Sequence, residues 1–200
     1  MLRISVLVSG GGTNLQAVID GVEGGEIPCA RIVRIIASNS RAYSLERAKK
    51  HGIPAAVIGK ENYPDPEARA REILRELDSA QTDLVVLAGY MSILSPDIIR
   101  AYEGRIINIH PSLIPKYCGM GFYGKRVHEA VLAGGEKESG ATVHYVDEGV
   151  DSGPIILQGR VPVLAEDTAD TLAARVLETE HRILVQSIRW LAEKKMENER

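Results

Sequence analysis

Short apolar runs alternate with longer amphipathic stretches through the first half of the chain. The runs at residues 4–8, 32–37, 55–58, 84–88 and 106–109 are rich in β-branched side chains, which is typical of buried strands. Residues 13–22, 44–51 and 66–80 have helical composition, and Gly52-Ile53-Pro54 marks the end of the second of these helices. This alternation predicts an α/β fold with a single doubly wound, mostly parallel sheet and helices on both faces.

The second half of the chain has a different pattern. A glycine-rich stretch at residues 118–124 precedes a short helix at 127–132, and the runs at 141–146 and 155–163 predict two further strands of the same sheet. Residues 169–195 predict one long amphipathic helix, because apolar residues recur there at near-helical spacing among charged ones. We expect the charged tail at residues 193–200 to fray into solvent.

Composition narrows the possible functions. The 200 residues, with a net charge of -3 and a pI of 6.0, predict a single domain over residues 1–200 without a basic field to attract nucleic acid. No apolar run approaches the ~20 residues that span a bilayer, so we expect no membrane insertion. Cys29 and Cys118 form no CxxC pair, which argues against a disulfide framework or a zinc site and favours a cytoplasmic location.

Three consecutive glycines follow the first predicted strand, in the segment Ser9-Gly10-Gly11-Gly12-Thr13-Asn14. Such a loop lets the backbone approach a ligand, and its free N–H groups at a helix start favour an anion. We therefore predict a site for a phosphate monoester, although an ordinary strand-to-helix turn is a common alternative for glycine loops in general. A nicotinamide site would need glycine at Leu15, and a P-loop would need a lysine that this loop lacks.

Asn108 and His110 lie two residues apart at the end of a predicted strand, so in an extended backbone both face the same side. Acyl transfer to an amine passes through a tetrahedral intermediate with a negative oxygen, and both side chains are suitable hydrogen-bond donors to it. Asp151, in a later acidic turn, is the candidate carboxylate that would orient His110, keep it charged and accept a proton. Thr142 and His144 share one face of the preceding strand and are candidates to support this cluster from behind.

Simpler interpretations of these residues remain open. A single histidine near a strand end is more often structural, and Asn108 could cap a turn. Cys118 could be a nucleophile, but nothing around it indicates an activated thiol. The chain has no GxSxG elbow, and Gly149 and Gln158 break the spacing of a calcium loop that would begin at Asp147. The histidines interpreted as structural or surface residues are His51, His128 and His181.

Four segments resemble the phosphoribosylglycinamide formyltransferases, a family of purine biosynthesis. They are SGGGTNLQAVID from residue 9, DLVVLAGYMSILSP from 83, RIINIHPSLIPKY from 105 and ATVHYVDEGVDSGPIILQ from 141. The resemblance implies a formyltransferase-like Rossmann-type fold and an enzyme that moves a formyl group from 10-formyltetrahydrofolate to the amine of 5-phosphoribosylglycinamide. It places nucleotide-phosphate binding in the N-terminal half of the chain, and folate binding and catalysis in the C-terminal half.

The resemblance also implies roles for particular residues. The catalytic positions are Asn108, His110 and Asp151. The nucleotide positions are Gly12, Thr13 and Asn14 at the phosphate and Glu180 at the ribose. The folate positions are Met91, Ser92, Ile93, Leu94, Asn108, Val146, Asp147, Glu148, Gly149, Val150 and Asp151. Many members have basic residues where this chain has Ser92 and Pro66, and Arg69 and Arg71 are the candidates to compensate.

The expected co-substrate is 10-formyltetrahydrofolate, and no metal is implied. The expected partners are small-molecule substrates, bound by a monomer or a homodimer, with neither nucleic acid nor membrane involved. Two rival functions are a hydrolase that releases formate from the same folate and a non-catalytic module that binds a nucleotide or a folate.

Overall fold

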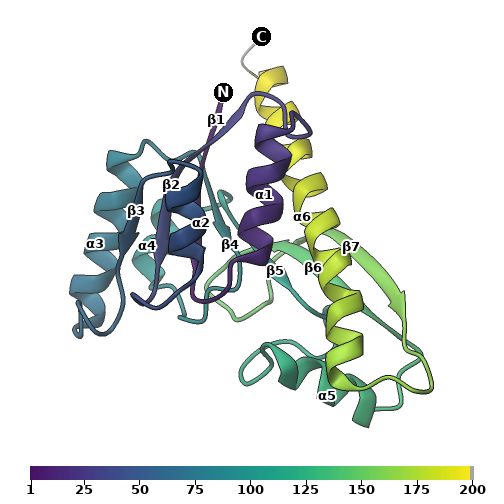
Figure 1. Cartoon of the computed structure of the whole chain (residues 1–200). Coiled ribbons are helices and arrows are strands. Elements are labelled where there is room, and N and C mark those ends of the chain that lie inside the picture. Colours follow the sequence, from purple (N-terminus) through teal and green to yellow (C-terminus); the bar gives the residue numbers. More distant parts are fainter. Residues whose placement is uncertain (199–200) are drawn as a thin grey trace.

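The computed structural model describes residues 1–198 and contains a seven-stranded sheet with the strand order β3-β2-β1-β4-β5-β6-β7 (Figure 1). The strands are β1 (Leu2–Val8), β2 (Ala30–Ala37), β3 (Ala55–Val57), β4 (Leu84–Leu87), β5 (Ile106–His110), β6 (Glu138–Tyr145) and β7 (Ile155–Pro162). The helices are α1 (Thr13–Glu23), α2 (Ser44–Lys50), α3 (Pro66–Ser79), α4 (Pro96–Ala101), α5 (Lys125–Ala133) and α6 (Ala169–Asn198). Every strand and helix predicted from the sequence is present, close to its predicted bounds.

Most of the sheet is parallel. β1 pairs in parallel with β2 and β4, β2 with β3, and β4 with β5, whereas β6 is antiparallel to β5 and β7 is antiparallel to β6. The predicted mostly parallel sheet is confirmed, and the two C-terminal strands extend it as expected. Parallel strands joined by helices have their carboxyl ends at one edge, which in Figure 1 lies on the side of α5. Ligands of open α/β sheets bind at this edge.

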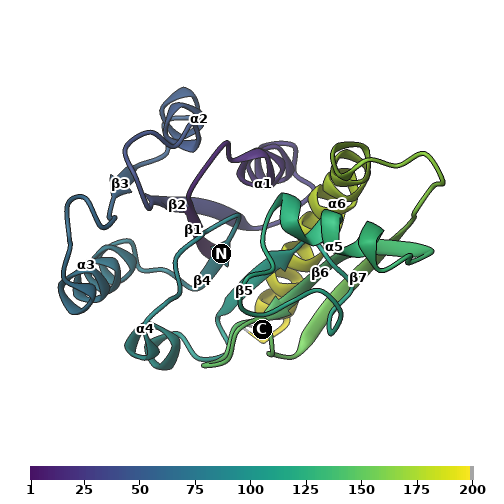
Figure 2. The same cartoon turned by 90° about the horizontal axis from the view of Figure 1, so that it is seen from below.

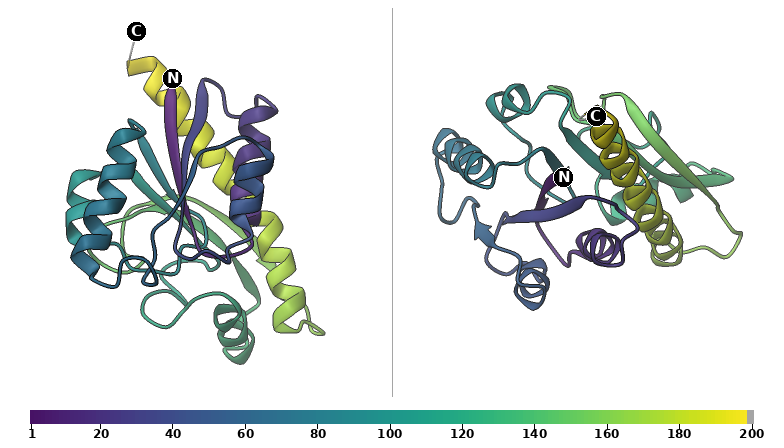
Figure 3. Two further views of the ribbon diagram at one scale, coloured as in Figure 1. Left: turned by 60° about the vertical axis from the view of Figure 1, so that its left-hand side comes forward. Right: turned by 90° about the horizontal axis from the view of Figure 1, so that it is seen from above.

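Helices cover both faces of the sheet, with α1, α2 and α6 on one face and α3 and α4 on the other (Figure 2). Side chains of each strand point alternately to the two faces. In β1, Ile4 and Val6 belong to the core beneath α1 and α6, whereas Leu7 belongs to the core beneath α3 and α4. Figure 3 shows α6 lying beside α1 and continuing past it toward α5. The doubly wound arrangement predicted from the sequence is therefore confirmed.

Helix α4 is a segment that the hydrophobic pattern does not reveal, because six residues are too few to show a helical period. Its signal is local. The Ser95 hydroxyl accepts a hydrogen bond from the Ile98 N–H, and Pro96 takes the first helical position. Asp65 and Pro66 begin α3 in the same way, so Pro66 serves the helix start.

The C-terminal helix is longer than expected. α6 continues to Asn198, so the prediction of fraying is wrong for residues 193–198, and residues 199–200 lie outside the described part of the chain. Ala192 is buried, and Lys195 Nζ donates to Asp83 Oδ1 at 2.7 Å, so tertiary contacts outweigh the charged composition. Of the predicted apolar stripe, Leu172, Val176, Ile183 and Ile188 are buried and Leu191 is half-buried. Within the described residues, no helix is both long and apolar enough to cross a membrane.

Candidate active site

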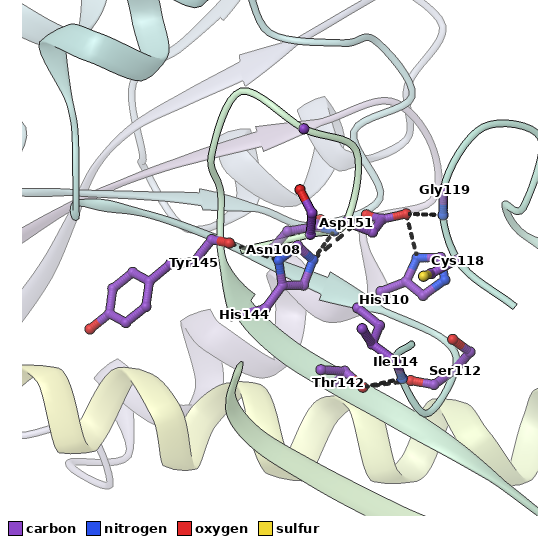
Figure 4. A network of polar contacts seen from close by, with 12 residues as sticks. Asn108, His110, Ser112, Ile114, Cys118, Gly119, Thr142, His144, Tyr145 and Asp151 are labelled. Carbon is purple, nitrogen blue, oxygen red and sulfur yellow. Dashed lines mark hydrogen bonds and ion pairs between the residues drawn. The ribbon is translucent and has the colours of Figure 1, made fainter. Parts of the chain in front are cut away.

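Polar side chains from β5, β6 and the β6–β7 connection meet at the carboxyl edge of the sheet. Asn108 and His110 occupy the end of β5, and the pairing register sets His144 opposite Asn108 and Thr142 opposite His110. The β6–β7 connection brings Asp151 to the same place. Figure 4 shows Asp151 directed at both Asn108 and His110, so the three predicted catalytic side chains lie together.

Asp151 is the centre of this cluster. Its Oδ2 lies 3.6 Å from His110 Nδ1 and accepts a hydrogen bond of 3.0 Å from the Gly119 N–H. Its Oδ1 lies 3.6 Å from His144 Nε2 and accepts a longer bond of 3.4 Å from Asn108 Nδ2. Burial raises the pKa of this carboxyl, but the contacts with His144, His110 and Gly119 outweigh burial and hold the pKa below its usual value. Asp151 is therefore an ionised carboxylate between two imidazole rings.

His110 is held by its ring nitrogens. Its Nε2 lies 2.9 Å from the Tyr117 carbonyl oxygen, which can only accept a hydrogen bond, so Nε2 carries a proton. Nδ1, on the side of Asp151, is the atom that can gain or lose one. Burial lowers the pKa of His110, and the Tyr117 carbonyl and the Asp151 charge, which both raise it, do not compensate. Asp151 does favour the charged form of His110, as expected, but burial has the larger effect and lowers the pKa overall.

His144 orients Asn108. His144 Nδ1 donates to the Tyr145 carbonyl oxygen at 2.8 Å, and its Nε2 faces Asn108. Asn108 Nδ2 donates to this Nε2 at 3.2 Å, so the amide is fixed with its NH₂ toward the cluster. Thr142 acts further away, because its hydroxyl donates to the Ser112 carbonyl oxygen at 2.6 Å and holds the segment that follows β5.

A cavity of about 650 Å³ opens at this edge of the sheet. Its volume falls within the roughly 300–1,000 Å³ that is typical of small-molecule sites. The predicted site residues that line it are Asn14, Met91, Ser92, Ile93, Leu94, Asn108, His110, His144, Val146, Asp147, Glu148, Gly149, Val150, Asp151 and Glu180. The predicted residues Gly12, Thr13 and Thr142 are not part of its wall.

The loop after β4 forms an apolar part of the wall. Met91 and Ile93 expose 56% and 71% of their surface, whereas Leu94 is buried. The Met91 N–H donates to Ser9 Oγ at 2.9 Å, which ties this loop to the end of β1. The loop at residues 146–151 contributes to the same cavity, so the two segments predicted to bind folate border one space.

The glycine loop begins α1 as predicted. Gly12 is the N-cap with φ 70°, and α1 has neither a side-chain cap nor an acidic residue in its first turn, so its first N–H groups are available to an anion. Asn14 pairs elsewhere, because its Nδ2 donates to Glu180 Oε2 at 2.7 Å and its Oδ1 is buried without a partner among residues 1–198. Burial raises the pKa of Glu180 despite this bond. Asn14 and Glu180 thus form a buried pair between the glycine loop and the catalytic cluster.

Some residues of the cavity wall were not predicted from the sequence. His128, interpreted as structural or surface, is buried in the wall, and its Nδ1 has no hydrogen-bond partner among the described residues. Burial, followed by the nearby His110, lowers its pKa. No motif in the sequence marks this residue. The other unpredicted wall residues include Met120, Phe122 and Tyr123 from the loop before α5, where Gly119, Gly121 and Gly124 all have positive φ.

The structure does not support the candidate roles of Cys118, Arg69 and Arg71. Cys118 is not an activated thiol, because burial and the charge of Asp151 raise its pKa. Arg69 donates to the Tyr63 carbonyl oxygen at 2.8 Å, and Arg71 is exposed on α3; neither lines the cavity. No group of three or more His, Cys, Asp or Glu side chains in the described part of the chain is arranged to hold a metal ion.

Comparison with known proteins identifies the family. Residues 2–188 match the family described as Formyl transferase. The chain belongs to this family. It is 43% identical to the phosphoribosylglycinamide formyltransferases of Haemophilus influenzae and Escherichia coli, over 96% of this chain and 88% of each relative. The crystal structure of glycinamide ribonucleotide transformylase 1 from Symbiobacterium toebii matches with a TM-score of 0.91 and 44% identity, over 97% of this chain and 89% of that one.

These matches confirm the resemblance and the formyltransferase fold predicted from the sequence, and the chain is an enzyme of this family. Formyl-tetrahydrofolate is the family's co-substrate. A formyltetrahydrofolate deformylase from Pseudomonas syringae has the same fold, with a TM-score of 0.87 and 29% identity; this chain covers 62% of it.

Proposed function

We propose that this enzyme transfers a formyl group from 10-formyltetrahydrofolate to the amine of 5-phosphoribosylglycinamide, a step of purine biosynthesis. The observation that carries the proposal is the convergence of Asn108, His110 and Asp151 at a cavity that also reaches Asn14 and Glu180. The relatives named phosphoribosylglycinamide formyltransferase match this chain over nearly its whole length, which supports the same reaction.

The reaction needs a donor for a developing negative charge. The amine nitrogen attacks the formyl carbon, whose oxygen becomes negative, and the bond from that carbon to N10 of the folate then breaks. We assign Asn108 Nδ2 to this oxygen, because its 3.4 Å bond to Asp151 is long enough for a substrate oxygen to replace it while His144 still holds the amide. Removing such a donor typically costs about 2.7–4 kcal/mol of transition-state stabilisation.

His110 and Asp151 manage the proton. The attacking amine must lose a proton, and N10 of the departing folate must gain one. We assign the first step to His110 Nδ1, which is unprotonated in the neutral ring, and Asp151 at 3.6 Å stabilises the imidazolium that forms. His110 then acts as a hydrogen-bond donor and acid toward the folate side.

The nucleotide is assigned to the opposite end of the site. The N–H groups of Gly12 and Thr13 would bind its phosphate at the start of α1. Asn14 Oδ1 lacks a donor, and Glu180 is a buried carboxyl whose pKa is raised by burial, so both suit the hydroxyls of a ribose. This arrangement orients the substrate amine toward His110.

The folate is assigned to the apolar side of the cavity. Residues Met91, Ser92, Ile93 and Leu94 on one side, and Val146–Asp151 on the other, would enclose its pterin ring. Ser92 carries no charge, so any hydrogen bond it gives the folate is a neutral one. We also propose that the enzyme acts in the cytoplasm and that it is a monomer or a homodimer. Sedimentation of the purified protein would test the oligomeric state.

The decisive experiment supplies both substrates and follows formylated nucleotide by mass spectrometry. We expect product only when the folate and the nucleotide are both present. Formate release from the folate alone would favour a hydrolase, the second candidate, which the Pseudomonas syringae relative exemplifies. Binding in a calorimeter without any product would favour a binding module.

A further inference from the structure

Helix α2 holds the carbonyl groups of the glycine loop. The Ser44 N–H donates to the Gly10 carbonyl oxygen at 3.1 Å, and Arg47 Nε donates to the Gly11 carbonyl oxygen at 2.8 Å. In a trans peptide the N–H points opposite to the C=O. The N–H groups of Gly11 and Gly12, which share these peptide planes, are therefore turned away from α2. No hydrogen bond within residues 1–198 uses either of them.

Arg47 is itself fixed in place. Its Nη1 donates to Gln16 Oε1 on α1 at 2.9 Å, and its guanidinium lies 5.2 Å from the centre of the Tyr43 ring. A Cβ atom at Gly12 would lie 3.4 Å from Arg47 Cδ, so the side chain packs directly against the loop. One side chain thus connects α2, the glycine loop and α1.

The charge of Arg47 adds to this geometry. Its partners are a main-chain carbonyl, an amide oxygen and an aromatic ring, so these contacts leave its positive charge uncompensated by a carboxylate. That charge lies behind N–H groups that already favour an anion at the start of α1. A phosphate in front of the loop would be attracted by both.

We propose that Arg47 is a positioning residue for the substrate phosphate. It holds the Gly11–Gly12 peptide with its N–H toward the anion and does not touch the phosphate itself. The inference rests on the proposed function, in which the glycine loop binds the phosphate of the nucleotide. Arg47 thus sets the conformation of the glycine loop, although no residue of its helix, α2, lines the cavity.

Kinetics of two variants test the proposal. Arg47→Met keeps an unbranched stem against Gly12 but removes the guanidinium, and Arg47→Lys keeps the charge without the planar fork. We expect the KM for the nucleotide to rise about tenfold in Arg47→Met and less in Arg47→Lys. The kcat and the KM for the folate should stay close to wild type. The control is Arg41→Met, because the Arg41 side chain is 86% exposed and should leave every constant unchanged.

A binding measurement tests the same point without catalysis. Inorganic phosphate titrated into the ¹⁵N-labelled protein should shift the amide signals of Gly11 and Gly12, and Arg47→Met should need about tenfold more phosphate for the same shift. An unchanged nucleotide KM with an unchanged titration overturns the inference. A parallel loss of kcat and of folate affinity, with a lowered unfolding midpoint, also overturns it in favour of a purely structural role. A wild-type protein that forms no formylated nucleotide overturns the proposed function instead, and the phosphate titration still decides the role of Arg47.

Discussion

The glycine loop and the catalytic cluster serve their ligands in opposite ways. The loop is a contiguous segment, residues 10–14, that offers main-chain N–H groups at the start of α1. The cluster consists of side chains from separate elements and is buried, with the side chains of His110 and Asp151 only 6% and 13% exposed. The comparison teaches that an anion can be bound by exposed backbone, whereas proton transfer needs a desolvated environment that shifts pKa values.

The same difference predicts which kinetic constant each region controls. Contacts with the phosphate are made equally in the ground state and the transition state, so they set KM. Contacts with the reacting atoms strengthen as charge develops, so they set kcat. Substitutions in the two regions should therefore separate the two constants.

The largest effect is expected from Asp151→Asn. Asparagine keeps the shape and can still accept the Gly119 N–H, but it removes the charge that stabilises the His110 imidazolium. We expect kcat to fall by about 10³-fold with little change in the nucleotide KM. Steady-state kinetics measure both constants, and circular dichroism checks the fold. A folded variant with kcat within tenfold of wild type would contradict the assignment.

His110→Ala should have an effect of the same size. The substitution removes the atom that takes the proton of the amine, and we expect kcat to fall by about 10³-fold. Arg41→Met is again the control, since the Arg41 side chain is 86% exposed outside the cavity and should leave both constants unchanged. The two variants are compared in the same product assay, and equal rates for both would refute the role of His110.

Gly12→Ala should affect binding of the nucleotide. Gly12 has φ 70°, and an added Cβ would lie 2.8 Å from Ser44 Cβ, so the loop must shift. We expect the nucleotide KM to rise about tenfold with kcat within about twofold, because the strain of a non-glycine residue there is roughly 1–2 kcal/mol. Gly25→Ala has a similar positive φ in open space and serves as the control. A fall in kcat with unchanged KM would contradict the claim that the glycine loop controls the nucleotide KM and the catalytic cluster controls kcat.

The smallest effect concerns the pH profile. Because burial lowers the pKa of His110 below the ordinary 6.5, its neutral form persists at lower pH, and activity should be retained somewhat below pH 6.5. Activity should fall once the pH drops through the lowered pKa, since a protonated Nδ1 cannot accept the proton of the amine. Asp151→Asn removes a charge that raises this pKa, so its acid limb should move to still lower pH. The measurement is kcat/KM against pH for both proteins, and an acid limb above pH 6.5 in the wild type would contradict this account.

Much of the fold was predictable because the relevant physics is local. Buried parallel strands appear as short β-branched runs, and the long helices show an apolar stripe at helical spacing, as in α3 and α6. The short helix α4 was missed because its signal is a cap and not a period. The tail of α6 was predicted wrongly because its order comes from Lys195 and Ala192 contacting the rest of the molecule.

The site was predictable only in part. The two-residue spacing of Asn108 and His110 indicated a shared face, and Asp151 followed from the family resemblance together with its acidic turn. The wall residue His128 had no sequence signal, since nothing local distinguishes a histidine that lines a cavity from one that fills a core. The support that α2 gives to the glycine loop was equally invisible, because Arg47 is one charged residue among several on a short helix.

Order along the chain was enough to predict the strands, every helix except α4, and a C-terminal half of different character; the antiparallel pairing of β6 and β7 appears only in the structure. Three-dimensional packing decided the surroundings of the chemical groups: burial lowers the pKa of His110 despite a carboxylate beside it, and Asn14 and Glu180, which are 166 positions apart, form a buried pair. The reason is that the periodicity of a helix or strand depends on residues close together in the sequence. The desolvation of a side chain depends instead on every element that packs around it.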